Sequence, residues 1–254
     1  MRLLCAFVLL AATTLGFTQP AAALTAEELA VKNVAAKGGA EQLAALRTLR
    51  LSGKMLVNGD QLQLALVTLV SRPGEIRQEA QLQGLTLVQA YDGKQGWKIN
   101  PFQGRKDPEK MSADDAKELG EDAADFAGAL VDYKAKGYKL EYLGTEDVDG
   151  TDAHKLRVTR ANGDITYVYL DPDYFLEIRI INRRIERGVP VETVTDYGDY
   201  EKVGGVYLPF EQVTGLKGSS DRQKVEYEKA DANPALDDSL FRFPATQPAA
   251  AANK

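Results

Sequence analysis

The chain has 254 residues, 44% of them hydrophobic, and its 37 acidic residues outnumber 31 basic ones, for a formal net charge of −6. A mildly acidic, well-mixed composition argues against nucleic acid as a partner and against adsorption to anionic lipid headgroups. The single cysteine, Cys5, lies in the first residues. The rest of the chain therefore has no disulfide, no thiolate metal site and no cysteine nucleophile.

Residues 1–23 have the pattern of a cleavable secretory signal peptide. Arg2 precedes an apolar run from Leu3 to Leu15, and the small residues Ala21 to Ala23 offer a cleavage site. The run is shorter than the ~20 residues of a membrane-spanning helix. Lipid modification needs the apolar region before the cysteine, and only Arg2, Leu3 and Leu4 lie between the initiator and Cys5. We therefore expect an unanchored periplasmic protein of a Gram-negative type envelope.

Two short helices are expected next. Thr25 and Glu28 form a capping-box pattern, which predicts a helix from Thr25 to the glycine pair Gly38-Gly39. Ala40 to Leu46 can form a second short turn.

From Leu49 onward, short alternating runs separated by turn residues predict an antiparallel meander. Asn58-Gly59, Asp149-Gly150 and Asn162-Gly163 each have the residues of a type I′ hairpin, in which both central positions need positive φ. Alternation also predicts which side chains share a face: Tyr138 with Leu140 and Tyr142, His154 with Leu156 and Val158, and Leu176 with Ile178 and Ile180. Glu177 and Arg179 are expected on the opposite, solvent-exposed face.

The runs Gln61 to Val70 and Gly84 to Tyr91 are apolar on both faces, so something must cover their far side. The best cover is a helix that begins at the N-cap Ser112. Its apolar positions have helical spacing: Leu119, Ala123, Phe126, Ala127, Leu130 and Val131. Gly120 and Gly128 weaken the helix, as expected for two short helices or a mobile lid. We expect residues 24–243 to form one β domain and the Ala/Pro-rich residues 244–254 to be disordered.

No catalytic or metal centre is predicted. His154 is the only histidine, and its mid-strand position favours a packing role over catalysis; one histidine cannot build a zinc site. Asp171-Pro172-Asp173 could be an acid/base pair but is first of all a turn signal. Residues 147–152 place their glycine too early for a calcium loop. Phosphate-binding glycine motifs are missing as well. The sequence favours a protein that is not an enzyme and needs no cofactor.

Several motifs resemble the periplasmic lipoprotein carrier LolA. They are Val70-Ser71-Arg72-Pro73, Tyr91-Asp92-Gly93-Lys94, Trp97 and Asn100-Pro101-Phe102, in that order. Farther on, Leu170-Asp171-Pro172, the segment from Asp199-Tyr200 to Val206-Tyr207-Leu208-Pro209, and Leu236-Asp237-Asp238 leading to Phe241-Arg242-Phe243 are similar to the wider family of outer-membrane lipoprotein-sorting proteins. The chain is longer toward its C-terminus than the short carrier.

The resemblance implies a mainly β fold: an incomplete, strongly curved antiparallel β-barrel with an N-terminal helix and a helical lid over a concave, apolar face. It also implies that Arg72 latches the lid, where a guanidinium could cap several lid carbonyls; the alternative is an ordinary surface arginine at an exposed turn. The residues expected to shelter acyl chains are Leu62, Leu64, Leu66, Leu85, Leu87 and Trp97, with Phe126 and Leu130 from the lid.

The function expected from the resemblance is that of a monomeric periplasmic lipid or lipoprotein carrier with a chaperone-like role. Its partners would be the acyl chains of its cargo, an inner-membrane donor and an outer-membrane acceptor. An RseB-like sensor or protein-interaction module, without transport activity, is the alternative. A lipid hydrolase is less favoured, because it would need an activated nucleophile that the sequence does not reveal.

Overall fold

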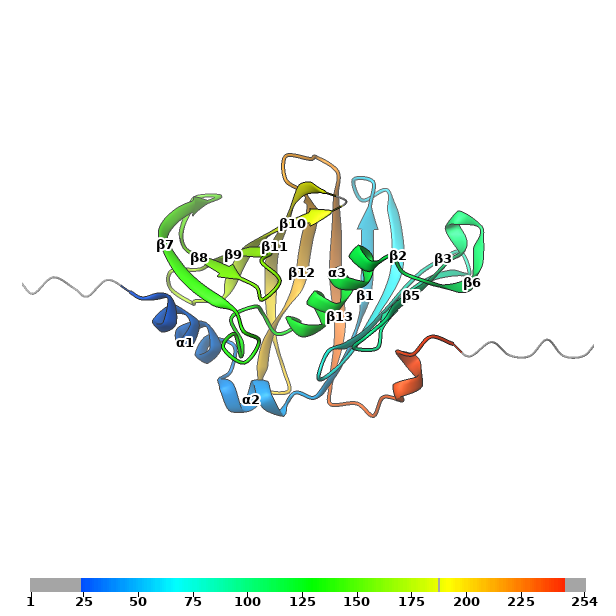
Figure 1. Ribbon diagram of the computed structural model, residues 1–254, viewed down its shortest axis with the longest axis horizontal. Coiled ribbons are helices and arrows are strands. Elements are labelled where there is room, and N and C mark those ends of the chain that lie inside the picture. The colour runs from blue at the N-terminus through cyan, green and yellow to red at the C-terminus, as the bar shows by residue number, and fades with distance from the viewer. Residues whose placement is uncertain (1–23, 187, 245–254) are drawn as a thin grey trace, which may run out of the picture.

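The structure is a computed structural model that describes residues 24–186 and 188–244 (Figure 1). The expected signal peptide, residues 1–23, lies outside the described residues, as do residues 245–254 of the expected disordered tail. Within the described ranges, no helix has the length and apolar character needed to cross a membrane.

Thirteen antiparallel strands form one sheet in the described part of the chain, in the order β6-β5-β4-β3-β2-β1-β13-β12-β11-β10-β9-β8-β7. The chain builds one wing outward from β1 to β6, then returns from β7 to β13, which pairs with β1. The strands are β1 (Thr48–Val57), β2 (Leu62–Ser71), β3 (Glu75–Leu82), β4 (Leu85–Tyr91), β5 (Gly96–Asn100), β6 (Arg105–Lys110), β7 (Lys139–Val148), β8 (Thr151–Thr159), β9 (Ile165–Leu170), β10 (Glu177–Glu186), β11 (Val189–Val203), β12 (Val206–Leu216) and β13 (Arg222–Ala232).

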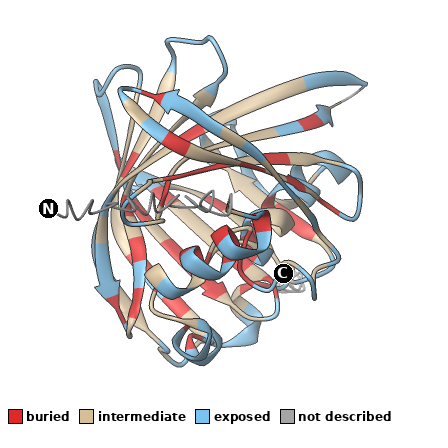
Figure 2. Ribbon diagram, turned by 90° about the vertical axis from the view of Figure 1, so that its left-hand side faces the viewer, coloured by how far each residue is buried: buried red, intermediate tan, exposed pale blue. Residues whose placement is uncertain are grey.

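The sheet does not close, because β6 and β7 remain as free edges, and it curves strongly between its two wings (Figures 1 and 2). Register shifts in β13 opposite β1, in β7 and in β10 mark β-bulges, which bend a strand and increase its twist. Gly53 of β1 lies at the shift opposite β13, where an added Cβ would be 2.1 Å from the carbonyl oxygen of Glu226. The predicted mainly β, unclosed antiparallel fold is therefore confirmed.

Three α-helices and two 3₁₀ turns accompany the described sheet: α1 (Ala26–Ala36), α2 (Ala40–Ala45), η1 (Pro101–Gln103), α3 (Ala113–Ala124) and η2 (Asp238–Leu240). The predicted capping box is confirmed, since the backbone N–H of Glu28 donates to Thr25 Oγ1 at 3.2 Å. Ser112 caps α3 as predicted. However, α3 ends at Ala124, and the predicted stripe beyond it continues in turns through residues 125–137.

The three predicted hairpins differ in their turns. Asp149 and Gly150 both have positive φ and join the paired residues Val148 and Thr151, so this type I′ turn is confirmed. The Asn58-Gly59 turn is wider than a two-residue hairpin, because Asp60 also has positive φ and Val57 pairs with Leu62. The type I′ prediction for Asn162-Gly163 is wrong. Asn162 instead accepts the N–H of Asp164 through its side chain, and Gly163 has the positive φ.

The predicted faces of residues 176–180 are also wrong. A bulge between Glu177 and Arg179 reverses the alternation, so Ile178 packs on the outer face near Tyr169 while Ile180 packs inside. Glu177, expected in solvent, is only 3% exposed. Both of its carboxylate oxygens accept hydrogen bonds of 2.8 Å from Lys37 Nζ at the end of α1.

Gly128, in the turns after α3, lies directly against this ion pair. Its φ is +104°, and an added Cβ would lie 2.5 Å from Glu177 Oε1 and 2.8 Å from Lys37 Nζ. Backbone strain and the clash with a buried ion pair act together here.

We expect Gly128→Ala to lower the free energy of unfolding by more than about 2 kcal/mol. Gly144→Ala is the matched control, because Gly144 also has positive φ, +92°, but open space around it; its cost should be roughly 1 kcal/mol. Urea denaturation of both variants measures the difference. Equal losses would show that the contact with the ion pair contributes nothing.

Candidate ligand-binding cavity

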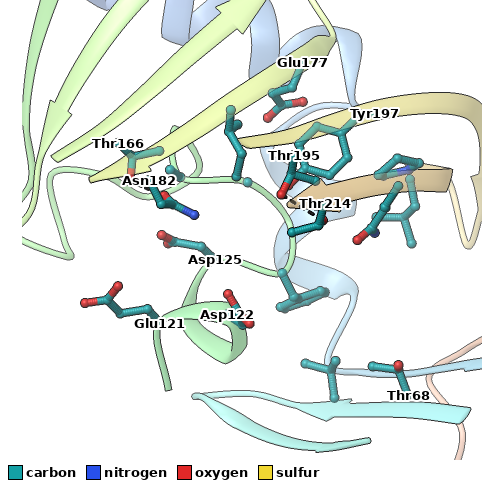
Figure 3. Close-up of a pocket in the computed structure, with 18 of the residues that line it drawn as sticks. Thr68, Glu121, Asp122, Asp125, Thr166, Glu177, Asn182, Thr195, Tyr197 and Thr214 are labelled. Carbon is teal, nitrogen blue, oxygen red and sulfur yellow. Dashed lines mark hydrogen bonds between the residues drawn. The ribbon is translucent and has the colours of Figure 1, made fainter. Parts of the chain in front are cut away.

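A cavity of about 240 Å³ lies between the concave face of the sheet and the cover formed by α3 and residues 125–137 (Figure 3). This cover links the two free edges of the sheet, because it connects β6 to β7 in the chain. The strand residues that line the cavity come from both wings and include Leu49, Leu51, Thr68, Val70, Ile76, Thr166, Val168, Ile180, Asn182, Thr195, Tyr197, Thr214 and Tyr227.

Charged side chains tie α3 to both wings. On the β7–β13 wing, Glu118 pairs with Arg184 at 3.0 Å, and Lys117 pairs with Asp164. On the other wing, Lys98 Nζ lies 3.5 Å from Asp115. The helix therefore bridges the wings through ion pairs of which several are partly solvent-exposed.

Arg160, which follows β8, is the most connected of these groups. Its Nη1 lies 2.6 Å from Asp125 Oδ2 and donates to the hydroxyl of Tyr138 at 3.0 Å. Its Nε donates to Thr166 Oγ1 at 3.3 Å. Since a buried guanidinium must have its donors satisfied, these contacts fix the end of the cover against the sheet.

The cavity is more polar than expected. Thr195 and Thr214 share a hydrogen bond of 3.0 Å, and Thr166 donates to Asn182 at 2.8 Å (Figure 3). These side chains come from strands β9 to β12, where alternation turns threonine and asparagine inward. The prediction of an apolar concave face is therefore wrong for this wing.

Among the charged residues that line the cavity, Asp122 differs in its strongly raised pKa. It lies on the α3 side, opposite the strands that carry Thr195, Thr214 and Tyr197 (Figure 3). Asp122 is an exposed residue that opens onto the cavity, and the protein atoms that form the cavity walls desolvate its carboxyl group in part. Desolvation raises the pKa of Asp122 to about 7, and the charge of Glu118 adds to the effect. Arg184 and Arg160 oppose this shift.

A second, apolar stretch continues the concave face toward the β1–β2 and β3–β4 hairpins. Leu62, Leu64 and Leu66 alternate on the same side of β2 as the cavity residues Thr68 and Val70. The partners that pack with Leu64 and Leu66 are Met55, Val57, Ala80, Leu82, Leu87, Val225 and Tyr227. Tyr227 also lines the cavity, so the stretch and the cavity are continuous.

The structure brings five of the predicted lipid-contacting residues together in this stretch and places a sixth in the cavity wall. Leu64 and Leu66 are buried, whereas Leu62 and Leu85 remain 37% and 41% exposed. Phe126 lines the cavity directly. Leu87 completes the group from β4.

Trp97 and Leu130 lie elsewhere. Gly96 faces α3, so the next residue, Trp97, faces the opposite side of the sheet. There it is buried under the C-terminal segment, and its Nε1 donates to the carbonyl oxygen of Phe241 at 2.7 Å. Leu130 packs in the cluster of α1 with β8 and β9. Other parts of the protein therefore bury both residues, and neither of them lines the cavity.

Arg72 contacts the cover, as the latch prediction requires, but not through carbonyl groups. Its guanidinium lies 5.2 Å from the ring centroid of Phe126 and 3.8 Å from the carboxylate of Asp132. Partial burial lowers the pKa of Arg72, which the charge of Asp132 offsets in part. The geometry is that of a cation–π contact with a weak ion pair.

Sequence reasoning missed the acidic side of α3. Glu118, Glu121, Asp122 and Asp125 are spaced at i, i+3, i+4 and i+7, which places them on one helix face. The same pattern was visible in the sequence beside the apolar stripe. The partners Lys37, Arg160 and Arg184 come from distant segments and have no local signal.

The residues considered for catalysis lie away from the cavity. His154 Nδ1 is 2.9 Å from the hydroxyl of Tyr142, and its ring stacks on Phe175. Asp171 accepts the N–H groups of Asp173 and Tyr174, which confirms a turn. In the described parts of the chain, no group of three or more His, Cys, Asp or Glu side chains is arranged to hold a metal ion.

The raised pKa of Asp122 predicts a pH-dependent stability. The folded protein holds this proton more tightly than the unfolded chain, so the contribution of Asp122 to stability falls as pH rises from about 4 to about 7 and stays level above. Asp122→Asn removes the effect. We expect it to gain on the order of 1–2 kcal/mol over the wild type between pH 4 and pH 8, because water in the cavity screens part of the charge.

Urea denaturation at several pH values measures this gain. Asp114→Asn, on the same helix but in its first turn and outside the cavity lining, is the control and should show no such change. A constant stability difference between Asp122→Asn and wild type across this pH range would contradict the raised pKa.

The contact of Arg72 with the cover predicts a local effect on dynamics. Arg72→Gln should increase amide hydrogen exchange in residues 126–132 severalfold, since it removes the contacts with Phe126 and Asp132. Arg50→Gln, at an exposed position of β1, serves as the control. If Arg72→Gln leaves the amide exchange of residues 126–132 unchanged, Arg72 is an ordinary surface arginine and does not latch the cover.

The structure is similar to solved proteins, although no family model matches the sequence and no curated protein matches it either. A DUF1329 family protein from Desulfovibrio piger matches with a TM-score of 0.57 and 14% identity, covering 85% of this chain and 95% of that one. A LolA superfamily protein from Nitrosomonas europaea matches with a TM-score of 0.57 and 13% identity, covering 87% and 98%. A domain described as an outer membrane lipoprotein-sorting protein, from Vibrio parahaemolyticus, matches with a TM-score of 0.56 and 12% identity, covering 85% and 95%. Over most of its length the chain therefore has a LolA-like fold.

Proposed function

We propose that this protein is a periplasmic carrier that shelters the acyl chain of a lipid or lipoprotein. The observation that carries the proposal is the apolar stretch around Leu64 and Leu66, which is continuous with the covered cavity through Tyr227. Leu62 and Leu85 leave part of this stretch open to solvent. An acyl chain lying along it would remove exposed apolar surface on both sides of the contact.

The expected gain in binding free energy is large enough to hold an acyl chain. Burial stabilises a ligand by about 0.8 kcal/mol per methylene, so a chain that buries about six methylenes gains roughly 5 kcal/mol before the cost of ordering it. Such a contact needs no specific hydrogen bond. It therefore suits cargo that must be taken up and released.

We infer that the cover opens, although α3 is held both by ion pairs and by the burial of Leu119 and Ala123 against the sheet. The side chains of Lys117 and Glu118 are 40% and 47% exposed, so water replaces part of their pairing energy when the helix moves. The cover then alternates between closed and open states, and cargo binding shifts their populations.

Two further features support this assignment. Residues 1–23 have the sequence pattern of an export signal. The solved relatives in fold include proteins described as LolA superfamily and lipoprotein-sorting domains. The partners would be an inner-membrane donor and an outer-membrane acceptor.

The test is to purify the protein from a membrane-containing host and to analyse its extract by mass spectrometry, with fluorescent fatty acids as added ligands. Leu85→Asp places a charge in the apolar stretch and should weaken fatty-acid binding at least tenfold. Leu143→Asp is the matched control, because Leu143 is 40% exposed, close to the 41% of Leu85, but lies on the edge strand β7.

Equal binding by both variants would place the acyl site elsewhere. If the protein binds neither a co-purified lipid nor an added fatty acid, the carrier proposal is wrong. A protein that co-purifies stoichiometrically in that case would favour the sensor or interaction module.

A further inference from the structure

The charges that line the cavity do not balance. Five lining residues are acidic, Glu118, Glu121, Asp122, Asp125 and Glu177, and three are basic, Lys37, Arg160 and Arg184. Formally the lining therefore carries two more negative than positive charges. A covered cavity weakens screening by solvent, so this excess attracts a cation more strongly than it would at an open surface.

The basic groups are already paired. Lys37 is bonded to Glu177, Arg184 to Glu118, and Arg160 to Asp125. An anionic headgroup would have to compete with these carboxylates for each of them. Each positive group of the lining therefore has a carboxylate partner among the described residues, although the Nε–H of Arg184 has no hydrogen-bond partner.

Asp122, unlike these basic groups, has no partner of opposite charge in the part of the chain that the structure describes. Among the described residues it has no ion pair and no hydrogen bond, and its side chain faces the cavity (Figure 3). The charged groups around it are Glu118 and Glu121 on α3, Arg184 on β10 and Arg160 after β8. Both arginines have other carboxylate partners.

Aromatic rings line the same cavity. Tyr197 from β11 and Tyr227 from β13 line the cavity together with Asp122. Burial raises the pKa of both phenols, and the charge of Asp122 adds to that effect. Tyr200 and Phe126 also line the cavity. A carboxylate beside aromatic faces is the arrangement that recognises alkylammonium ions, since the faces of the rings attract positive charge.

From the unpartnered carboxylate, these aromatic rings and the adjoining apolar stretch, we infer that the ligand carries a positively charged ammonium group. Asp122 holds this group with Tyr197 and Tyr227, while the acyl chain lies along the stretch where Leu62 and Leu85 are exposed. This inference rests on the proposed carrier function and adds the headgroup chemistry to it. The cavity of about 240 Å³ has room for a compact headgroup.

Four ligands with the same twelve-carbon chain test the inference by calorimetry, each below its micelle concentration: dodecylammonium, dodecyltrimethylammonium, dodecanoate and the neutral dodecyl maltoside. At pH 8 the two ammonium ligands should bind at least tenfold more tightly than dodecanoate. In Asp122→Asn this preference should fall below threefold, whereas Asp114→Asn should retain it. A primary ammonium that binds more tightly than the trimethylated one indicates hydrogen bonds as well as charge.

Dodecyltrimethylammonium keeps its charge at every pH, so any pH dependence of its binding reports the protein. Asp122, with a pKa of about 7, is mostly protonated at pH 6 and ionised at pH 8, and the affinity should therefore rise about tenfold between them. Asp122→Asn should remove this dependence. Because that variant is expected to be at least as stable as the wild type, misfolding does not mask the result.

Equal affinity for cationic and anionic ligands, tighter binding of dodecanoate, or an unchanged preference in Asp122→Asn would each overturn the ammonium inference while leaving a carrier in place. If none of the four ligands binds, the carrier function itself is refuted and the inference with it.

Discussion

The buried ion pair of Lys37 with Glu177 joins three parts of the molecule on which the cavity depends. Lys37 ends α1, Glu177 begins β10, and Gly128 of the cover packs against both charged groups. Each buried charge compensates the other, because either one alone would be left in the interior without solvation or a counter-charge. The helix, the sheet and the cover are therefore fixed relative to one another at this point, and the bulge before Arg179 is what turns Glu177 inward.

The unclosed sheet gives the cover its importance. Since β6 and β7 do not pair, α3 and the turns after it connect the wings through side chains rather than through backbone hydrogen bonds. Side-chain ion pairs at a partly exposed surface exchange readily with water. In the proposed carrier, opening of the cover breaks these ion pairs and the apolar contacts of Leu119 and Ala123, while the backbone hydrogen bonds of the sheet stay in place.

The concave face has two chemically different parts. Threonine, asparagine and tyrosine side chains face α3 on the β9–β13 side, whereas leucine and methionine continue the face on the β1–β4 side. A purely apolar ligand would leave the polar part unused, and a purely polar one would leave the leucines exposed. An amphiphile matches both, and the unpartnered Asp122 favours a cationic headgroup over an anionic one.

The sequence by itself determined the secondary structure of most elements, the capped starts of α1 and α3, the antiparallel meander and the resemblance to LolA-like proteins. These features depend on local patterns: alternation, capping residues and turn residues. Only the tertiary structure decided that Glu177 faces inward, that Trp97 lies outside the cavity and that Arg160 holds Asp125. A single bulge reverses alternation, and an ion pair between distant segments leaves no periodic trace, so neither could be derived from neighbouring residues.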